Sequence, residues 1–442
     1  MSEERDVVDQ EWQGASQWQE PGVRLTQQVL SGGGPNDDLP SAVPVFIGWL
    51  KTAGDEGATR LLSIASWDQV QAYSGTWPAS LLDSVQHYFD NGGGPCWVLQ
   101  GNPPSELSSL DSLARWWEGL LKEASDLLLG EPTITLVASP QLVLEVEVVA
   151  AFFDQSEKVV PMLIEAWKAL LNACRAREDL FFVLDAPADP KVATACIQAL
   201  RGEQALGERG EHAALYGPHL ITDYRKGFAE EARVDEAGLR VVPPSGAVLG
   251  VYVRSDALSG VWKAPANEVL AHVVRPQVRE TLASGWFDVA QVPINLIRSF
   301  AGRGTRVWGC RTLAASPGSA FRYVQVRRMV TWIEANLKRI CRFAVFEPNH
   351  EITWFQLRGL CNAWLRRVWL EGGLAGADEA SAYSVRVGLN ESMTAADIEA
   401  GCLIIQVGVA VLHAAEFIEV KLVLKVGDEQ ASGTDLLGSQ WV

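Results

Sequence analysis

Between residues 42 and 300 the chain alternates short apolar segments with longer amphipathic ones, and this rhythm constrains the fold more than any other feature. Segments of strand length occupy residues 42–50, 96–101, 133–140 and 180–187, and helical segments occupy residues 80–94, 113–129 and 159–177. The apolar segments lack a two-residue alternation, as is typical of strands buried on both faces. Repeated strand–helix–strand order predicts βαβ units, and therefore a largely parallel sheet covered by helices. The polar, glycine-punctuated stretch 201–212 is a predicted surface loop.

The last third of the chain mixes predicted helices and strands, so we expect an α/β fold in the middle and α+β overall. Two stretches repeat apolar residues at helical spacing: Val326, Met329, Val330, Ile333 and Leu337, and then Leu357, Leu360, Trp364, Leu365 and Val368. Their outer faces are expected to carry cations: Arg327, Arg328 and Lys338, and then Arg358, Arg366 and Arg367. Thr394 and Asp397 form a predicted capping box, with Gly401 just beyond the helix end. Residues 402–412 are a predicted buried strand.

Two extended segments flank this body. After an acidic leader at residues 1–20, Val23, Leu25 and Val29 fall on one side of a predicted strand. Residues 31–40 follow as a hinge-like loop, since its glycines free the backbone: Gly32, Gly33 and Gly34. Near the other end, residues 418–426 alternate strictly, with five apolar side chains on one face: Ile418, Val420, Leu422, Leu424 and Val426.

The C-terminal strand is followed by a polar linker that contains Gly427 and Gly433, a second predicted hinge. Trp441 comes after this linker, from which the core of its own chain is hard to reach. We therefore expect Trp441 to fill a pocket in a partner. A lone strand exposes unpaired N–H and C=O groups. An arm on a glycine hinge can therefore reach a neighbouring copy and add a strand to its sheet.

The composition excludes several kinds of partner. The formal net charge is -17, whereas a nucleic-acid-binding protein needs clustered cations to replace condensed counterions. An anionic membrane would repel such a chain, and the longest apolar runs, 142–153 and 402–412, are too short to span one. The polar, acidic N-terminus lacks the pattern of a signal peptide. We therefore expect no nucleic acid, no direct membrane insertion and folding in the cytoplasm.

The seven cysteines are an odd number without a CxxC pair, which predicts buried free thiols in a reducing compartment. The glycine-rich stretches 31–35 and 91–95 lack the lysine that continues a phosphate loop. The histidines have no metal-ligand spacing, so we expect no metal and no cofactor. Asp185 ends a predicted parallel strand, where α/β enzymes place carboxylates, but no nucleophile motif accompanies it.

The turn AGRGTR at 301–306 is either an anion-binding nest or a tight turn whose Arg303 and Arg306 pair with carboxylates of the same or a neighbouring subunit. It belongs to a series of blocks in fixed order: EPGVRLTQQVLSGGG (20–34), GVWKAPAN (260–267), INLIRSFAGRGTRVWGCRTL (294–313), FRYVQVRRMVTWIE (321–334), VFEPN (345–349) and AEFIEVKLVL (415–424). In this order the blocks resemble the contractile phage tail sheath protein family, which spans phages, tailocins and phage-tail-like contractile injection systems. Ala301 departs from the proline common in this family, and Cys310 from a usual small residue.

The resemblance implies a structural subunit and no enzyme. Such subunits polymerise into six-fold helical rings around an inner tube and contract to drive the tube through a target envelope. It also implies a subtilisin-like α/β middle domain without protease residues. The implied partners are other copies of the chain, the inner tube protein, baseplate and tail terminator or cap proteins, and sheath paralogues. Five arginines are candidate lattice or tube contacts: Arg303, Arg306, Arg358, Arg366 and Arg367.

The expected division of the chain is a leader (1–20), an N-terminal β arm and hinge (21–40), an α/β sheath domain (41–300), a C-terminal sheath core (301–426) and a C-terminal arm (427–442). The long leader and the unfamiliar end leave open a minor sheath paralogue at a baseplate or cap. A hydrolase on a subtilisin-like fold is a distant alternative, because no Asp, His and Ser motif is present. Sheaths of type VI secretion lack the blocks at 260–267 and 302–309. The particle would assemble in the bacterial cytoplasm and then become part of a virion or a released particle.

Overall fold

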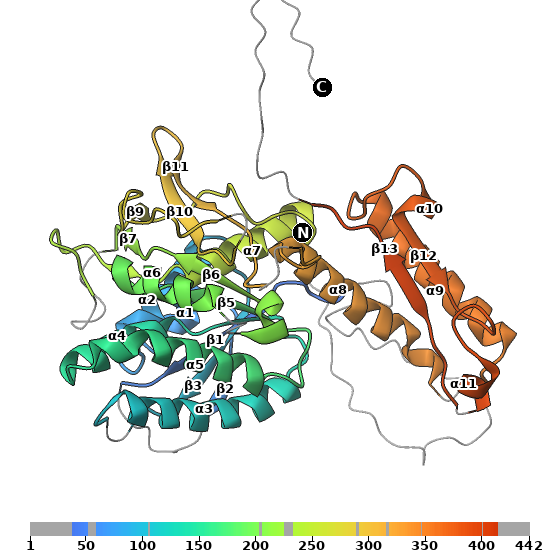
Figure 1. The fold of residues 1–442 in the computed structure, drawn as a ribbon, viewed down its shortest axis with the longest axis horizontal. Coiled ribbons are helices and arrows are strands. Elements are labelled where there is room, and N and C mark those ends of the chain that lie inside the picture. Colours follow the sequence, from blue (N-terminus) through green and yellow to red (C-terminus); the bar gives the residue numbers. More distant parts are fainter. Residues whose placement is uncertain are drawn as a thin grey trace, which may run out of the picture. The chain divides into compact units, whose positions relative to one another are not determined.

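The computed structural model describes residues 38–413, apart from 52–58, 105–106, 203–205, 225–232, 289–290, 315–317, 346 and 400. The predicted arm strands and both glycine hinges lie outside these residues. Trp441 lies outside them as well. What the structure describes is therefore the body to which the arms are joined (Figure 1).

A sheet of eight strands forms the centre of the α/β region, in the order β11-β10-β6-β5-β4-β1-β3-β2. Its strands are β1 (Pro44–Trp49), β2 (Arg60–Ile64), β3 (Cys96–Gly101), β4 (Leu136–Ala138), β5 (Phe181–Asp185), β6 (Ala213–Gly217), β10 (Asn295–Phe300) and β11 (Gly304–Trp308). The pairs from β3 through β10 are parallel, whereas β2 and β11 join the two edges in antiparallel fashion. The predicted parallel sheet is confirmed.

Both faces of this sheet are covered by helices. Val45 and Ile47 of β1 belong to one apolar cluster and Phe46 between them to the other, so alternate side chains of one strand enter different cores. The first cluster contains residues of α3 (Leu110–Gly130), α4 (Pro140–Phe152), α5 (Val159–Ala173) and α6 (Pro190–Arg201). The second contains residues of α1 (Trp67–Gln71), α2 (Ala79–Asp90) and α7 (Ser245–Ser259). Two-sided burial explains why the strands read as continuous apolar runs.

The sequence pattern missed α4, whose mostly apolar residues show little helical periodicity because several of its sides are covered. The predicted surface loop at 201–212 is wrong in part. Residues Gly207–His212 form the 3₁₀ helix η3, and Gly210 is buried so closely that a Cβ there would lie 2.3 Å from the carbonyl oxygen of Leu313. Two further 3₁₀ turns are η2 (Ser156–Lys158) and η4 (Arg342–Ala344).

A small three-stranded sheet, in the order β8-β7-β9, lies in the second half of the α/β region. Its strands are β7 (Leu220–Thr222), β8 (Val241–Val242) and β9 (Val273–Pro276), all antiparallel to their neighbours. The strand β9 lies near β10 of the main sheet without pairing with it. The expected boundary between residues 300 and 301 falls in the turn that joins β10 to β11, inside one hairpin.

The C-terminal region consists of two long helices and a two-stranded sheet (Figure 1). Its elements are α8 (Val324–Cys341), α9 (Glu351–Leu370), α10 (Glu379–Ala382), β12 (Tyr383–Arg386), α11 (Ala395–Glu399) and β13 (Gln406–Val409). Both predicted amphipathic helices are confirmed. The predicted cap of α11 is confirmed too: the Asp397 N–H donates to the Thr394 hydroxyl, Thr394 donates back to the Asp397 carboxylate, and Gly401 has a φ of 74°.

Three details of this region differ from the sequence-based expectation. Arg327 and Arg328 are buried, because α8 packs between the α/β region and α9 and leaves little outer surface. Leu360 is exposed, since it lies just off the face that α9 buries. The predicted buried strand at 402–412 is the half-exposed β13, whose alternate residues face solvent. Among the helices of the described residues, none is long and apolar enough to cross a membrane.

Candidate assembly sites

The first candidate site is the place where the N-terminal segment joins the body, which we call the arm anchor: residues Leu39–Ser41 and the side chains that hold them. The Leu39 N–H donates to the side-chain oxygen of Asn336 (2.8 Å), and the Trp332 indole N–H donates to the Leu39 carbonyl (2.7 Å). Asn336 and Trp332 lie one helical turn apart on α8, so both face the same stretch of chain. The backbone at residue 39 is thereby fixed on both sides.

A buried ion pair completes the arm anchor. Arg328 of α8 donates to both carboxylate oxygens of Asp256 on α7, at 3.2 and 2.6 Å. The side chains of the pair are only 2% and 7% exposed. Arg328 also donates to the Ser41 carbonyl (3.1 Å), and the Ser41 hydroxyl donates to Asp256 (2.6 Å). A charge pair this deeply buried is stabilised when its remaining polar atoms are also bonded, and Ser41 supplies two such bonds, although the buried Arg328 Nε has no partner among the described residues.

The arm anchor therefore ties three parts of the chain together. Arg328 stacks on the ring of Tyr252 (4.6 Å to the centroid), whose hydroxyl bonds that of Tyr216 on the central strand β6 (2.7 Å). Any pull on residue 39 is transmitted to α8, α7 and the main sheet. Sequence reasoning missed this contact, since Arg328 and Asp256 are 72 positions apart and the pattern placed Arg328 on an outer face.

The second candidate site is the sheet of β12 and β13, which pair antiparallel with Tyr383 opposite Val409 and Val385 opposite Val407. These four side chains join the apolar cluster with Trp364, Leu365 and Val368 of α9. The opposite face, with Ser384, Arg386, Gln406 and Gly408, is exposed. Within the described part of the chain each strand has only the other as its ladder partner, so both outer edges are open. Such edges bind further strands readily.

One face of α9 is open as well. Ile352, Phe355 and Leu370 are 65%, 78% and 66% exposed, and they lie on the side of the helix opposite its buried residues. Gly359 and Ala363 lie between them on the same side and leave it flat. Exposed apolar side chains gathered on one helix face are typical of a surface that contacts another molecule.

The five candidate arginines are not brought together in one place. Arg366 and Arg367 lie on α9 and pair with Glu379 (2.6 Å) and Glu371 (3.2 Å). Arg358, also on α9, donates to the Val387 carbonyl (2.6 Å) and pairs with Glu391 (2.5 Å). Arg303 and Arg306 belong to the turn between β10 and β11, a different element of the fold.

In that turn, Gly302 and Gly304 have φ values of 71° and 74°, which only glycine adopts freely. Arg306 donates to the carbonyl oxygens of Arg303 (3.1 Å) and Asn267 (2.6 Å), so backbone oxygens take the place of the carboxylate that the sequence suggested. Arg303 is exposed, with its guanidinium 6.0 Å from the Phe300 ring. In the part of the chain that the structure describes, the turn leaves Arg303 without a carboxylate partner.

Asp185 has a structural role in this geometry. Its carboxylate accepts a hydrogen bond from the Ser245 N–H (2.7 Å) in the first turn of α7, where a helix favours an acceptor. Burial raises its pKa to about 7, and the hydrogen bonds from Ser245 lower it only in part. In the part of the chain that the structure describes, no group of three metal-ligating side chains occurs.

The cysteines of the body are all free thiols: Cys96, Cys174, Cys196, Cys310 and Cys361 are buried, Cys341 is half-buried and Cys402 is exposed. The prediction of free thiols is confirmed, and burial is confirmed for five. Burial raises the pKa of Cys196 to about 12, so this thiol is inert at neutral pH.

A chain with an anchored arm root, an open sheet edge and an uncovered helix face belongs to the class of subunits that are completed by neighbours. Comparisons with known proteins agree with this class. No model of a known protein family matches the chain, but solved structures do. A chain of the anti-feeding prophage baseplate in its contracted state is 33% identical, with a TM-score of 0.75, over 92% of this chain and 99% of that one. A chain of the PVC sheath complex, an extracellular contractile injection system in its contracted state, is 29% identical with a TM-score of 0.63, over 92% and 98%.

Two phage proteins named tail sheath protein match a shorter stretch. That of Vibrio phage KVP40 is 28% identical over 144 residues, which are 30% of this chain and 20% of the phage protein. That of Enterobacteria phage T4 is 27% identical over 117 residues, or 26% and 18%. The chain thus matches about a fifth of the length of these phage relatives. The chain belongs to the family of contractile tail sheath proteins.

Proposed function

We propose that the chain is a structural subunit of the contractile sheath around the inner tube of a phage-tail-like particle. It polymerises into six-fold helical rings and contracts to drive the tube through a target envelope. The observation that carries this proposal is the open two-stranded sheet of β12 and β13, in a chain that resembles a contractile-particle protein along nearly its whole length. An isolated pair of strands is marginal in water, whereas added strands complete it.

The strands that complete this sheet come from the arms of neighbouring copies. The N-terminal arm carries apolar Val23, Leu25 and Val29 on one side, and the predicted strand that leads into the C-terminal arm carries Ile418, Val420, Leu422 and Leu424. Such a side matches the α9-facing side of β12 and β13, where Tyr383, Val385, Val407 and Val409 pack. One arm on each outer edge gives a four-stranded sheet built from three chains. Trp441 follows the second arm and fills a pocket in the copy that it reaches.

The hinges absorb the motion of contraction. Because the arm anchor fixes residues 39–41 to α8, bending has to occur before residue 39, at Gly32, Gly33 and Gly34. Gly427 and Gly433 play the same part for the C-terminal arm. Arm pairings then persist while the bodies rotate against one another. New contacts in the contracted lattice involve the arginines of α9 and of the turn: Arg303, Arg306, Arg358, Arg366 and Arg367.

The α/β region is a subtilisin-like domain used as a scaffold, with Asp185 engaged in holding α7 rather than in hydrolysis. We divide the chain into leader, N-terminal arm, α/β domain, sheath core and C-terminal arm, and place the β10–β11 hairpin with the α/β domain because it pairs in that sheet. The partners are other copies, the inner tube, baseplate and terminator or cap proteins. Assembly takes place in the bacterial cytoplasm before the particle is released.

A minor sheath paralogue next to the baseplate is the second candidate. It is favoured by the similarity to a chain of a baseplate structure, at 33% identity, beside the 29% to the helical sheath of the same particle. The two candidates differ in stoichiometry. A main sheath protein forms long tubes alone, whereas a minor paralogue forms a ring and then stops.

Electron microscopy of the purified chain tests the proposal. We expect striated tubes or sleeves, and their loss when residues 23–30 are deleted. Deleting residues 2–20, which precede the arm strand, serves as the matched control and leaves the tubes in place. A stable, isolated monomer at high concentration with both arms intact would contradict the proposal.

A further inference from the structure

A pocket on the described surface lies away from the assembly sites, between the small sheet and the main one. It has a volume of about 1030 Å³ and runs along β9, the turns at 278–287 and β10. Both strands present open edges to it in the described part of the chain, since β9 pairs only with β7, and β10 pairs with β6 only at Asn295 and Leu296. An extended segment of chain could therefore bind backbone groups along its walls. We call this pocket the arginine groove.

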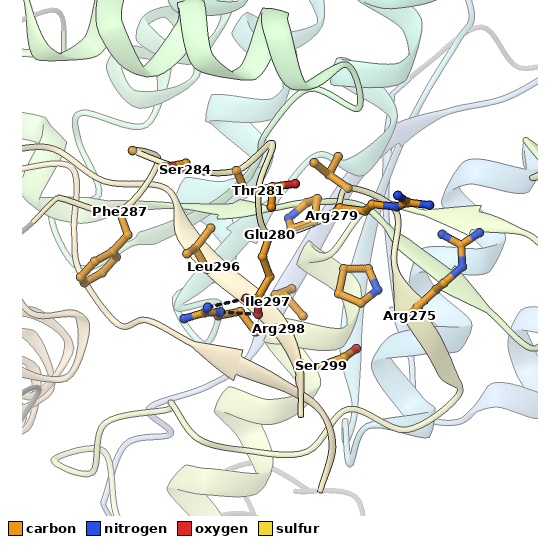
Figure 2. A pocket seen from close by; sticks show the side chains of 15 residues that line it. Arg275, Arg279, Glu280, Thr281, Ser284, Phe287, Leu296, Ile297, Arg298 and Ser299 are labelled. Atoms are coloured by element: carbon orange, nitrogen blue, oxygen red, sulfur yellow. Dashed lines mark hydrogen bonds and ion pairs between the residues drawn. The ribbon is translucent and has the colours of Figure 1, made fainter. Parts of the chain in front are cut away.

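The arginine groove is basic on a protein of net charge -17. Arg275, Arg279 and Arg298 line it, together with a single carboxylate, Glu280 (Figure 2). Arg298 and Glu280 neutralise each other through two parallel hydrogen bonds of 2.7 Å. Because Arg275 also pairs with Asp235, the charge in excess lies on Arg279.

Arg275 and Arg279 are available to an anionic partner. Arg275 is 55% exposed and makes one longer contact with Asp235 (3.3 Å). Arg279 is exposed and has no hydrogen bond or ion pair from its side chain to any described residue. In Figure 2 the side chain of Arg279 extends toward that of Arg275, so the two guanidinium groups face the same part of the groove. Paired guanidinium groups bind carboxylates with fixed geometry.

The floor of the groove is apolar, which argues for a peptide rather than a small anion. Val278 and Ile297 are buried beneath it, and Phe287 and Leu296 form part of its wall. A matching ligand would alternate carboxylates with apolar side chains and extend along a strand edge.

The leader of this chain has that composition. Residues 1–20 contain six carboxylates and a single arginine, interspersed with Val7, Val8, Trp12 and Trp18. We propose that the acidic leader of a neighbouring copy docks in the arginine groove. This rests on the proposed function in one respect, since the N-terminal arm is what brings the leader to that neighbour. The docked leader would add a third, charge-dependent link to the two strand pairings.

A binding measurement tests the groove itself. A fluorescent peptide of residues 1–20 is titrated into the chain that lacks residues 2–20, and its anisotropy is followed at low and at physiological salt. We expect Arg279→Glu to weaken binding about tenfold or more, the loss of one good charged contact. Arg115→Glu, at an exposed arginine of α3 outside the groove, is the matched control and leaves the affinity unchanged. Equal affinities for the two variants, or equal binding of a peptide whose six carboxylates are replaced by amides, would overturn the proposal.

A cross-linking experiment on the full chain tests the source of the leader. Benzoylphenylalanine in place of Trp12 is activated in assembled protein, and the products are separated by mass. We expect cross-linked dimers whose attachment site maps to residues 275–299. Cross-links within a single chain would refute docking to a neighbour. Because tubes are expected to form without residues 2–20, failure of either test leaves the proposed sheath function standing.

Discussion

The α/β region and the C-terminal region differ in how far their own residues complete them. In the α/β region the six parallel strands from β3 to β10 each have a partner on both sides, and apolar clusters cover both faces of the sheet. In the C-terminal region two strands have only each other among the described residues, and Phe355 of α9 is 78% exposed. The first is built like a scaffold that folds alone, and the second like one half of an interface.

The helix α8 joins these two regions, because it packs against both of them. Its first turn packs in the α/β core through Val324 and Val326, and its later turns pack against α9 through Met329 and Ile333. Between these contacts lies Arg328, which holds the root of the arm. Under the proposed function, the α/β region carries the load on an arm, while the C-terminal region receives the new strands.

The strongest test of this difference between the two regions is a substitution that blocks the open edge of β12. The Ala410 N–H donates to the Ala382 carbonyl, and hydrogen-bonded pairs alternate with non-bonded pairs along an antiparallel ladder. Val385, opposite Val407, is therefore in a non-bonded pair, and its N–H and C=O point away from β13. Val385→Pro then removes an outward N–H and no internal ladder bond. We expect tubes to disappear under the electron microscope, while the free energy of unfolding falls by only about 1 kcal/mol from lost packing. Ser384→Pro, at the neighbouring position, removes a ladder bond. It should therefore lower both the number of tubes and the free energy of unfolding. Normal tubes from Val385→Pro would show that this edge accepts no strand.

The next largest effect is expected at the arm anchor. Asp256→Asn keeps the shape of the side chain but leaves Arg328 buried without its counter-charge. Removing one partner of a buried pair costs about 3–5 kcal/mol, which urea denaturation would measure. Arg366→Gln at the exposed pair with Glu379 is the control and should cost less than about 1 kcal/mol. Equal losses would mean that Arg328 finds another partner and that the anchor is weaker than its geometry indicates.

Buried polar groups make the scaffold sensitive to pH, and His87 is the clearest case. Its ring lies within α2, fully enclosed, 3.0 Å from the Ala271 carbonyl, and burial lowers its pKa from 6.5 to about 4. The unfolded chain binds a proton first, so stability is present above pH 6.5 and is lost as the pH falls toward 4. The loss is on the order of 3 kcal/mol. His87→Gln should flatten this part of a plot of unfolding free energy against pH; an unchanged slope would assign the acid sensitivity to other groups.

Asp185 should show the opposite slope. Burial raises its pKa from 3.8 to about 7, so the unfolded chain loses this proton first as the pH rises. Stability from Asp185 is full below pH 3.8 and declines as the pH rises through about 7. Asp185→Asn keeps an acceptor for the Ser245 N–H and removes the decline, which thermal unfolding at several pH values would detect. A variant that still loses stability over this range would place the ionisation elsewhere.

The scaffold was more predictable from sequence than the interface, and the reason is physical. Strands such as β1 and β5 are buried on both faces by their own chain, so their apolar runs carry the whole signal. The helix α4 was missed because apolar residues lie on most of its sides, so its sequence lacks the 3.6-residue period of an amphipathic helix. Arg328 was misplaced because helical spacing shows which residues share a face and does not show what covers that face. The strand β13 was predicted to be buried because the apolar residues of a half-exposed strand resemble those of a core strand in the sequence.

The candidate sites divide in the same way. Fold-class patterns and the ordered motifs pointed to the family, yet the side chains of the arm anchor, Trp332, Asn336 and Asp256, carried no local signal. Their role depends on contacts between positions up to 297 residues apart. The predicted arm residues stay predictions, because they lie outside the described part of the chain.

The smallest effect on stability is expected at α9, although lattice contacts are proposed there. The side chains of Arg366 and Arg367 are 60% and 40% exposed, and they pair with the exposed Glu379 and Glu371. Exposed pairs contribute roughly 0.2–1 kcal/mol each, so Arg366→Glu with Arg367→Glu should barely move the unfolding transition. Under the proposed function the same change places like charges against a neighbour and should prevent assembly or contraction. Lys168→Glu, at an exposed pair on α5, is the matched control. If tubes of the α9 variant form and contract as before, these arginines make no lattice contact, and the open face of α9 must act through its apolar residues alone.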